Sequence, residues 1–128
     1  MEKIEEFKKK RKKLRNSFKY AFEGVHRELK EEQNLKIHIL IMILVIIAGF
    51  ILKLSPMEWI ICIILFGFVI ALELINTAIE LTVDLAMPEI HPKAKAAKDI
   101  AAAAVLVSAT CSVIIGVIIF LPKIINLL

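Results

Sequence analysis

The apolar residues of this sequence fall into three long blocks that contain no charged residue. These blocks are residues 39–52, 59–72 and 100–121. The third has 22 residues, and a helix needs roughly 20 to cross a lipid bilayer. The first reaches a similar length if the flanking His38 and Lys53 lie at the two interfaces, where a lysine can extend its amine to water. The pattern predicts three transmembrane helices, at 37–54, 57–87 and 94–121.

The second block reaches a spanning length only by continuing past Glu73 toward Ile79. No helix breaker follows until Pro88, so we expect one uninterrupted helix over 57–87. Such a helix is roughly 45 Å long, which exceeds a hydrocarbon core of about 30 Å. Its last turns are therefore expected to leave the membrane and to carry polar residues out with them.

Residues 1–34 show a different pattern, with one apolar stripe on an otherwise charged helix. The stripe has spacings of 4, 4, 3 and 4 positions and consists of Leu14, Phe18, Phe22, Val25 and Leu29. An unbroken basic run, Lys8–Lys13, precedes it. This amphipathic pattern predicts a surface helix that lies in the membrane interface with its lysines near anionic headgroups. A solvated coiled-coil helix or a partner-binding helix is the alternative.

Composition and charge favour an all-α membrane protein with a single domain, residues 1–128. Hydrophobic residues make up 59% of the chain, against roughly 45–50% in a soluble domain. Of the 17 Lys and Arg residues, twelve precede the first predicted span and three lie in 84–99. Only Lys53 and Lys123 remain for the other side, which predicts a cytoplasmic N-terminus and an external C-terminus. The net charge of +4 is then a membrane-surface signal, and no nucleic-acid partner is expected.

Polar residues on the second predicted span gather on one face. At about 100° per residue they occupy a stripe about 100° wide, which comprises Glu73, Asn76, Thr77, Glu80 and Asp84. Carboxylates are costly within a bilayer, and they mark functional sites there. Near the inner interface they are suited to Mg²⁺, which binds one or two carboxylates together with phosphate oxygens. The alternative is that these side chains form hydrogen bonds between helices.

Lys98 and Asp99 open the third predicted span at the same level. A lysine there can meet a phosphate as a point charge. Asp99 is either an active-site acid or an acid favoured by the helix dipole. Three further acids, Glu28, Glu31 and Glu32, end the N-terminal helix. Any of them could fold back toward the polar stripe, and composition indicates only that they are solvated.

The cysteines and two of the histidines carry weaker signals. Cys62 and Cys111 fall in apolar blocks without metal-ligand spacing, and we interpret both as buried free thiols. His38 and His91 lie at predicted interfaces, where we expect local hydrogen bonds rather than metal binding.

Two motifs in the chain resemble those of the prokaryotic diacylglycerol kinase family. The first is the Glu-Leu-Ile-Asn-Thr-Ala-Ile-Glu run at 73–80 with Asp84 after it, and the second is Lys-Ala-Ala-Lys-Asp at 95–99. The resemblance extends over 18–121. Within the family, the Glu-Gln-Asn-Leu-Lys-Ile-His segment at 32–38 is most similar to the undecaprenol kinase branch of Gram-positive bacteria.

This resemblance implies a role for each residue that matches a family motif. Glu32 and Glu80 match the pair that binds the Mg²⁺ carried with ATP. Glu73 matches the proposed general base for the lipid hydroxyl, and Asn76 matches a residue that contacts the nucleotide. The family also implies a homotrimer with active sites shared between adjacent subunits.

Three further residues are assigned to the nucleotide by the same resemblance. Lys98 matches a residue at the ATP phosphates, with Asp99 as its active-site neighbour, and Tyr20 matches an aromatic residue of the nucleotide region. No P-loop motif is present in the chain.

These features predict an ATP- and Mg²⁺-dependent lipid kinase at the cytoplasmic face of the cell membrane. Undecaprenol is the expected acceptor, and diacylglycerol is the alternative. A small ion-coupled transporter would instead use Glu73 and Glu80 as a proton relay, and a membrane scaffold would carry out no catalysis. A transporter needs a polar path to the outer side, whereas the outer halves of the predicted spans are nearly featureless.

Overall fold

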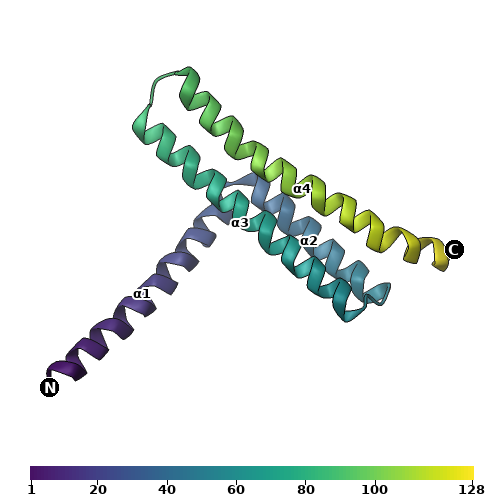
Figure 1. Ribbon diagram of the computed structural model, residues 1–128, viewed down its shortest axis with the longest axis horizontal. Helices are drawn as coiled ribbons and strands as arrows, with labels where there is room; N and C mark the ends of the chain where they lie inside the picture. The colour runs from purple at the N-terminus through teal and green to yellow at the C-terminus, as the bar shows by residue number, and fades with distance from the viewer. The chain divides into compact units, whose positions relative to one another are not determined.

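The computed structural model describes residues 1–128 and contains only helices. Its four helices are α1 Glu2–Glu31, α2 Gln33–Ile51, α3 Pro56–Ala86 and α4 Pro92–Leu127 (Figure 1). Three of these, α2, α3 and α4, are long and apolar enough to cross a membrane. The all-helical prediction and the prediction of three long apolar helices are confirmed. The chain divides into two compact units, residues 1–33 and 34–128.

The first unit is helix α1, whose surface carries charged pairs four residues apart. Lys10 Nζ lies 2.7 Å from Glu6 Oε1, and Arg27 Nε lies 3.2 Å from Glu31 Oε2. Exposed pairs of this kind support a helix by a few tenths of a kcal/mol each. The helix ends at Glu32, whose backbone is extended. Most of the predicted apolar stripe is exposed, and its contact with a membrane stays a prediction.

A short turn joins α2 to α3, and its local chemistry explains where each helix stops. Lys53 adopts the left-handed conformation (φ 56°), and the Leu54 N–H donates to the Gly49 carbonyl over 3.0 Å. This arrangement closes a helix C-terminus, so α2 ends earlier than the predicted residue 54. Ser55 then caps α3, because its hydroxyl accepts a hydrogen bond from the Glu58 N–H at 3.2 Å.

Helices α3 and α4 pack side by side as an antiparallel pair (Figure 1). Two ion pairs fix their register: Glu58 with Lys123 at one end, 3.1 Å apart, and Asp84 with Lys98 at the other. The buried residues of the pair are Cys62, Val69, Glu73 and Asn76 on α3, and Ala101, Val105 and Ser108 on α4. The small side chains of α4 allow the close approach that apolar helices need.

Helix α4 is longer than the predicted 94–121 at both ends. His91 caps its start, because the ring Nδ1 accepts a hydrogen bond from the Lys93 N–H at 3.1 Å. The next residue is a proline, which suits a first helical position because no partner is needed there for an N–H. At the other end Pro122 lies inside the helix without ending it. The fixed φ of proline is itself helical, and the helix continues past the lost hydrogen bond.

The second unit buries few apolar side chains. Leu35, Leu54, Cys62, Val69 and Val105 are buried, whereas most Leu, Ile and Phe side chains of α2, α3 and α4 are exposed. Soluble monomers rarely expose contiguous apolar surface on this scale. These side chains therefore require lipid, or another protein chain, against them.

Candidate active site

The polar stripe predicted on α3 runs from the interior of the helix pair to its end. Glu73 and Asn76 are 3% and 8% exposed, Glu80 is partly exposed, and Asp84 is exposed. A carboxylate buried as deeply as Glu73 is costly unless it has hydrogen-bonding or charged partners. The polar groups of the stripe thus become more exposed to solvent toward the C-terminus of α3.

The partner of Glu73 comes from α2. His38 Nε2 lies 3.2 Å from Glu73 Oε1, within hydrogen-bond distance, although the two residues are 35 positions apart. His38 thus forms a hydrogen bond as expected, but with a residue of another helix, while His91 forms the expected local bond, the capping bond described above. Sequence reasoning missed His38 as a site residue. The signal was that His38 is the one ionisable residue between Lys36 and Lys53.

One turn further along α3, Asn76 and Glu80 form a second polar contact. Asn76 Nδ2 donates to Glu80 Oε1 at 3.2 Å. The Asn76 Oδ1 atom is buried and has no hydrogen-bond partner. A buried acceptor left unpaired costs roughly 1–3 kcal/mol and calls for an explanation. An acceptor of this kind beside two carboxylates is suited to a hydrogen-bond donor on a bound molecule.

At the polar end of the helix pair, Lys98 forms an ion pair with Asp84 rather than with its sequence neighbour. Asp99 points to another partner, Lys95, whose Nζ lies 2.5 Å from Asp99 Oδ2 on an exposed face of α4. Because α4 begins at Pro92, Asp99 lies beyond the first turn, where the dipole of a helix terminus has faded. The helix-dipole explanation of Asp99 is therefore wrong.

The remaining predicted site residues belong to the first unit. Tyr20 is exposed on α1, and Glu32 is partly exposed at its end. Their roles at the nucleotide and at the metal stay predictions. Among the neighbouring acids, Glu28 is buried, which corrects the expectation that it is solvated, and Glu31 is exposed beside Arg27.

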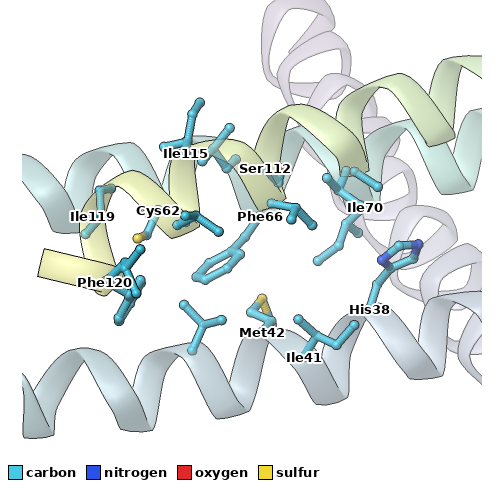
Figure 2. A pocket seen from close by; sticks show the side chains of 18 of the residues that line it. His38, Ile41, Met42, Cys62, Phe66, Ile70, Ser112, Ile115, Ile119 and Phe120 are labelled. Atoms are coloured by element: carbon cyan, nitrogen blue, oxygen red, sulfur yellow. The ribbon is translucent and has the colours of Figure 1, made fainter. Parts of the chain in front are cut away.

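An apolar groove of about 480 Å³ runs between α2, α3 and α4. Figure 2 shows His38 at one end of it and Phe120 at the other, with Phe66 and Met42 between them. The volume lies in the range of small-molecule sites, about 300–1,000 Å³. His38 lines one end of the groove and contacts Glu73, so this end lies beside the polar stripe.

The cysteines differ from each other in their surroundings. Cys62 lines this groove and is buried, as predicted, and both thiols are free. Cys111 is exposed, so the prediction that it is buried is wrong. Its block has no charged residue to mark one face, and the sequence therefore gives no sign of which face of α4 packs against α3.

Comparison with known proteins accounts for this combination of helices and polar residues. The family model for prokaryotic diacylglycerol kinase matches residues 19–120. This chain belongs to the prokaryotic diacylglycerol kinase family. The chain is 50% identical over 107 residues to the undecaprenol kinase of Bacillus subtilis (strain 168), covering 84% of this chain and 87% of that protein. It is 38% identical over 113 residues to a diacylglycerol kinase of Synechocystis sp., covering 88% of this chain and 65% of that protein.

Membership of the diacylglycerol kinase family gives the helical scaffold a function. The resemblance drawn from the two motifs is confirmed, and the chain is a lipid kinase. Together with three helices long enough to cross a bilayer, this makes it a multi-pass membrane protein. Both motifs lie within the matched residues, and in the second unit they meet at the polar end of the α3–α4 pair.

Proposed function

We propose that this lipid kinase transfers the γ-phosphoryl group of ATP, in a Mg²⁺-dependent reaction, to the hydroxyl of undecaprenol. The observation that carries the proposal is the pairing of buried Glu73 with His38 at the polar end of an apolar groove. A lipid alcohol needs both parts of this arrangement, because its chain is apolar and its hydroxyl must lose a proton. The 50% identity to an undecaprenol kinase supports this acceptor over diacylglycerol, the alternative.

Glu73 is proposed as the general base. Its carboxylate accepts the hydroxyl proton while the lipid oxygen bonds to the γ-phosphorus and the bond to the β-phosphate bridging oxygen breaks, leaving ADP. A correctly placed base contributes roughly 10²–10⁴-fold. Asn76 accepts a hydrogen bond from the substrates through its unpaired Oδ1. Lys98 leaves its ion pair with Asp84 and binds a phosphate oxygen of ATP. Asp99, held by Lys95, is proposed as the neighbouring acid of the site.

Glu80 and Glu32 are proposed as the carboxylates that hold Mg²⁺. No group of three or more His, Cys, Asp or Glu side chains in the chain is arranged to hold a metal ion. Mg²⁺ commonly needs only one or two carboxylates when phosphate oxygens supply the other ligands. Glu80 fits this chemistry, since it is partly exposed and Asn76 bonds only one of its two oxygens. When bound, the ion neutralises charge on the nucleotide phosphates.

The site is proposed to lie at the cytoplasmic face, with the N-terminus cytoplasmic and the C-terminus outside. The excess of Lys and Arg in α1 and at the starts of α2 and α4 supports this orientation. It would place the polar end of the α3–α4 pair where ATP is available. Tyr20 on α1 is proposed to contact the nucleotide there, and α1 is proposed to lie as an amphipathic helix on the membrane surface.

A direct assay tests the function. Purified protein in a bilayer is incubated with γ-labelled ATP, Mg²⁺ and a panel of lipid alcohols, with EDTA in a parallel sample. We expect label in the lipid phosphate of undecaprenol and none in the EDTA sample. Labelling of no lipid alcohol, by protein whose helicity is intact, would show that the proposed reaction is wrong.

The same assay ranks the two acceptors. An apolar groove discriminates modestly between lipids, whereas a site built to hydrogen-bond the esters of diacylglycerol would strongly reject a lipid that lacks them. We expect the higher kcat/KM with undecaprenol and slower, detectable use of diacylglycerol. A preference for diacylglycerol of more than about tenfold, or about 1.4 kcal/mol, would contradict this ranking while leaving the kinase activity standing.

A further inference from the structure

His38 is the residue that joins two features of the second unit. Its Nε2 atom lies 3.2 Å from Glu73 Oε1, and the same ring lines the end of the apolar groove (Figure 2). The His38 side chain is 23% exposed and that of Glu73 is 5% exposed, so the contact is largely shielded from water.

Helix α2 has few buried residues, and the nearest to His38 is Leu35, one turn away. Its buried residues are Leu35 and Gly49, close to its two ends, and between them the groove separates it from its neighbours. The His38–Glu73 contact therefore bridges α2 and α3 at the polar end of the groove. Without it, the Glu73 side chain would lose the contact that selects one of its rotamers.

The chemistry of the contact defines what His38 supplies. An ionised carboxylate can only accept hydrogen bonds, so Nε2 carries the proton whenever Glu73 is ionised. Such a donor fixes one carboxylate oxygen and leaves the other for a substrate. A base must be held within about 3 Å of the proton that it removes, and a misplacement of about 1 Å can cost about a hundredfold in rate.

The groove determines where a hydroxyl would arrive. Apart from His38, its wall is apolar except for Ser112, whose hydroxyl already donates to the Ser108 carbonyl at 2.9 Å. An apolar chain in the groove would therefore place its polar end beside His38 and Glu73.

We propose that His38 is a positioning residue for the acceptor step, which holds Glu73 at the mouth of the groove where the lipid hydroxyl arrives. The inference rests on the proposed function and adds to it a residue from α2. His38 acts through Glu73, so its loss should slow the chemical step and leave nucleotide binding intact.

Two amide substitutions test this role at matched polarity. Gln places an amide N–H about as far from the backbone as His places Nε2, whereas Asn is one methylene shorter. We expect His38→Gln to keep kcat within about threefold of the parent, and His38→Asn to lower kcat by about ten- to a hundredfold, with KM for ATP unchanged in both. Helicity and size-exclusion profiles establish that both variants are folded.

Each outcome bears on the inference. If the two variants are equally impaired, or equally active, reach to Glu73 is not what matters and the positioning role is wrong. A rise in KM for ATP with unchanged kcat would also overturn it. Parent protein that phosphorylates no lipid alcohol would instead contradict the proposed function, so the two failures are distinguishable.

Discussion

At Glu80, the effect of the negative charge can be separated from the effect of the hydrogen bond with Asn76. Asn76 Nδ2 donates to Glu80 Oε1, and a Gln at position 80 would still present an acceptor there. Glu80→Gln should therefore keep the contact while removing the negative charge proposed to hold Mg²⁺. We expect activity to fall at least about a hundredfold, a loss of roughly 2.7 kcal/mol, when measured as lipid phosphorylation at saturating ATP.

The Mg²⁺ dependence of the variant identifies the cause of that loss. A weakened metal site should require a higher Mg²⁺ concentration and recover part of its activity there. Folding should persist, because a neutral side chain costs less than a charged one in a membrane. Near-normal turnover of Glu80→Gln at ordinary Mg²⁺ would remove Glu80 from the mechanism.

At the residue scale, helical geometry alone predicted that Glu73, Asn76 and Glu80 share a face, because about 100° per residue is a property of any α-helix. The partner of Glu73 could not be predicted in this way. His38 reaches it from another helix, and the packing of helices depends on side-chain contacts across the whole unit. Of the two alternatives for Asp99, the helix-dipole explanation is wrong because Asp99 lies beyond the first turn of α4, which begins at Pro92.

The α2–α3 turn depends on a close approach at Gly49. A Cβ atom there would lie 2.7 Å from Trp59 Cη2 and 2.9 Å from Leu54 Cδ1. The Trp59 ring is also held by Phe50, with ring centroids 4.9 Å apart. We therefore expect Gly49→Ala to destabilise the protein by about 1–3 kcal/mol, observed as a lower melting temperature in detergent.

A second glycine provides the control. Gly67 lies within α3, and a Cβ atom there would meet nothing within 4 Å. Gly67→Ala should be neutral, or stabilising by roughly 0.5–1 kcal/mol, because alanine loses less backbone freedom in a helix. If both variants melt at the same temperature as the parent, the close packing inferred at Gly49 is wrong.

At the element scale, the number and type of helices followed from the apolar blocks, and their ends did not. Hydrophobicity changes gradually near a helix end, whereas caps are decided by single atoms. Lys53 closes α2 with a left-handed backbone that no propensity favours, and Pro122 lies inside α4 although the sequence suggested an end there.

For the whole molecule, we propose a homotrimer whose sites are shared between adjacent subunits. The small buried core of the second unit, and its many exposed apolar side chains, support an assembly. Co-expression of two inactive variants tests the sharing. If each active site combines Glu32 of one subunit with Glu73 of the next, a random mixture of Glu32→Gln and Glu73→Gln chains should recover about a quarter of the parent activity.

This recovery of activity is expected only if the two residues of one site come from different chains. Each variant alone provides the baseline, and chemical cross-linking in the membrane measures the number of subunits. A mixture no more active than its components would show that each site is built from one chain. Cross-linking that stops at dimers would contradict the trimer.

At the scale of the molecule, the sequence predicted a membrane protein with three spans because lipid demands long uncharged helices. It did not predict which helices pack together. The α3–α4 contact arises from small residues and from ion pairs at both ends, Glu58 with Lys123 and Asp84 with Lys98, which are separated in the chain. The apolar groove beside α2 likewise follows from packing and carries no sequence signature.

The most direct test of the account is the effect of Glu73→Gln on phosphate transfer to undecaprenol. The substitution keeps the side-chain shape and an acceptor for His38, but it removes the group proposed to take the hydroxyl proton. With γ-labelled ATP, Mg²⁺ and undecaprenol in a bilayer, we expect initial rates about 10²–10⁴-fold below those of the parent, with KM for ATP little changed. A folded Glu73→Gln protein that labels undecaprenol as fast as the parent would contradict the account.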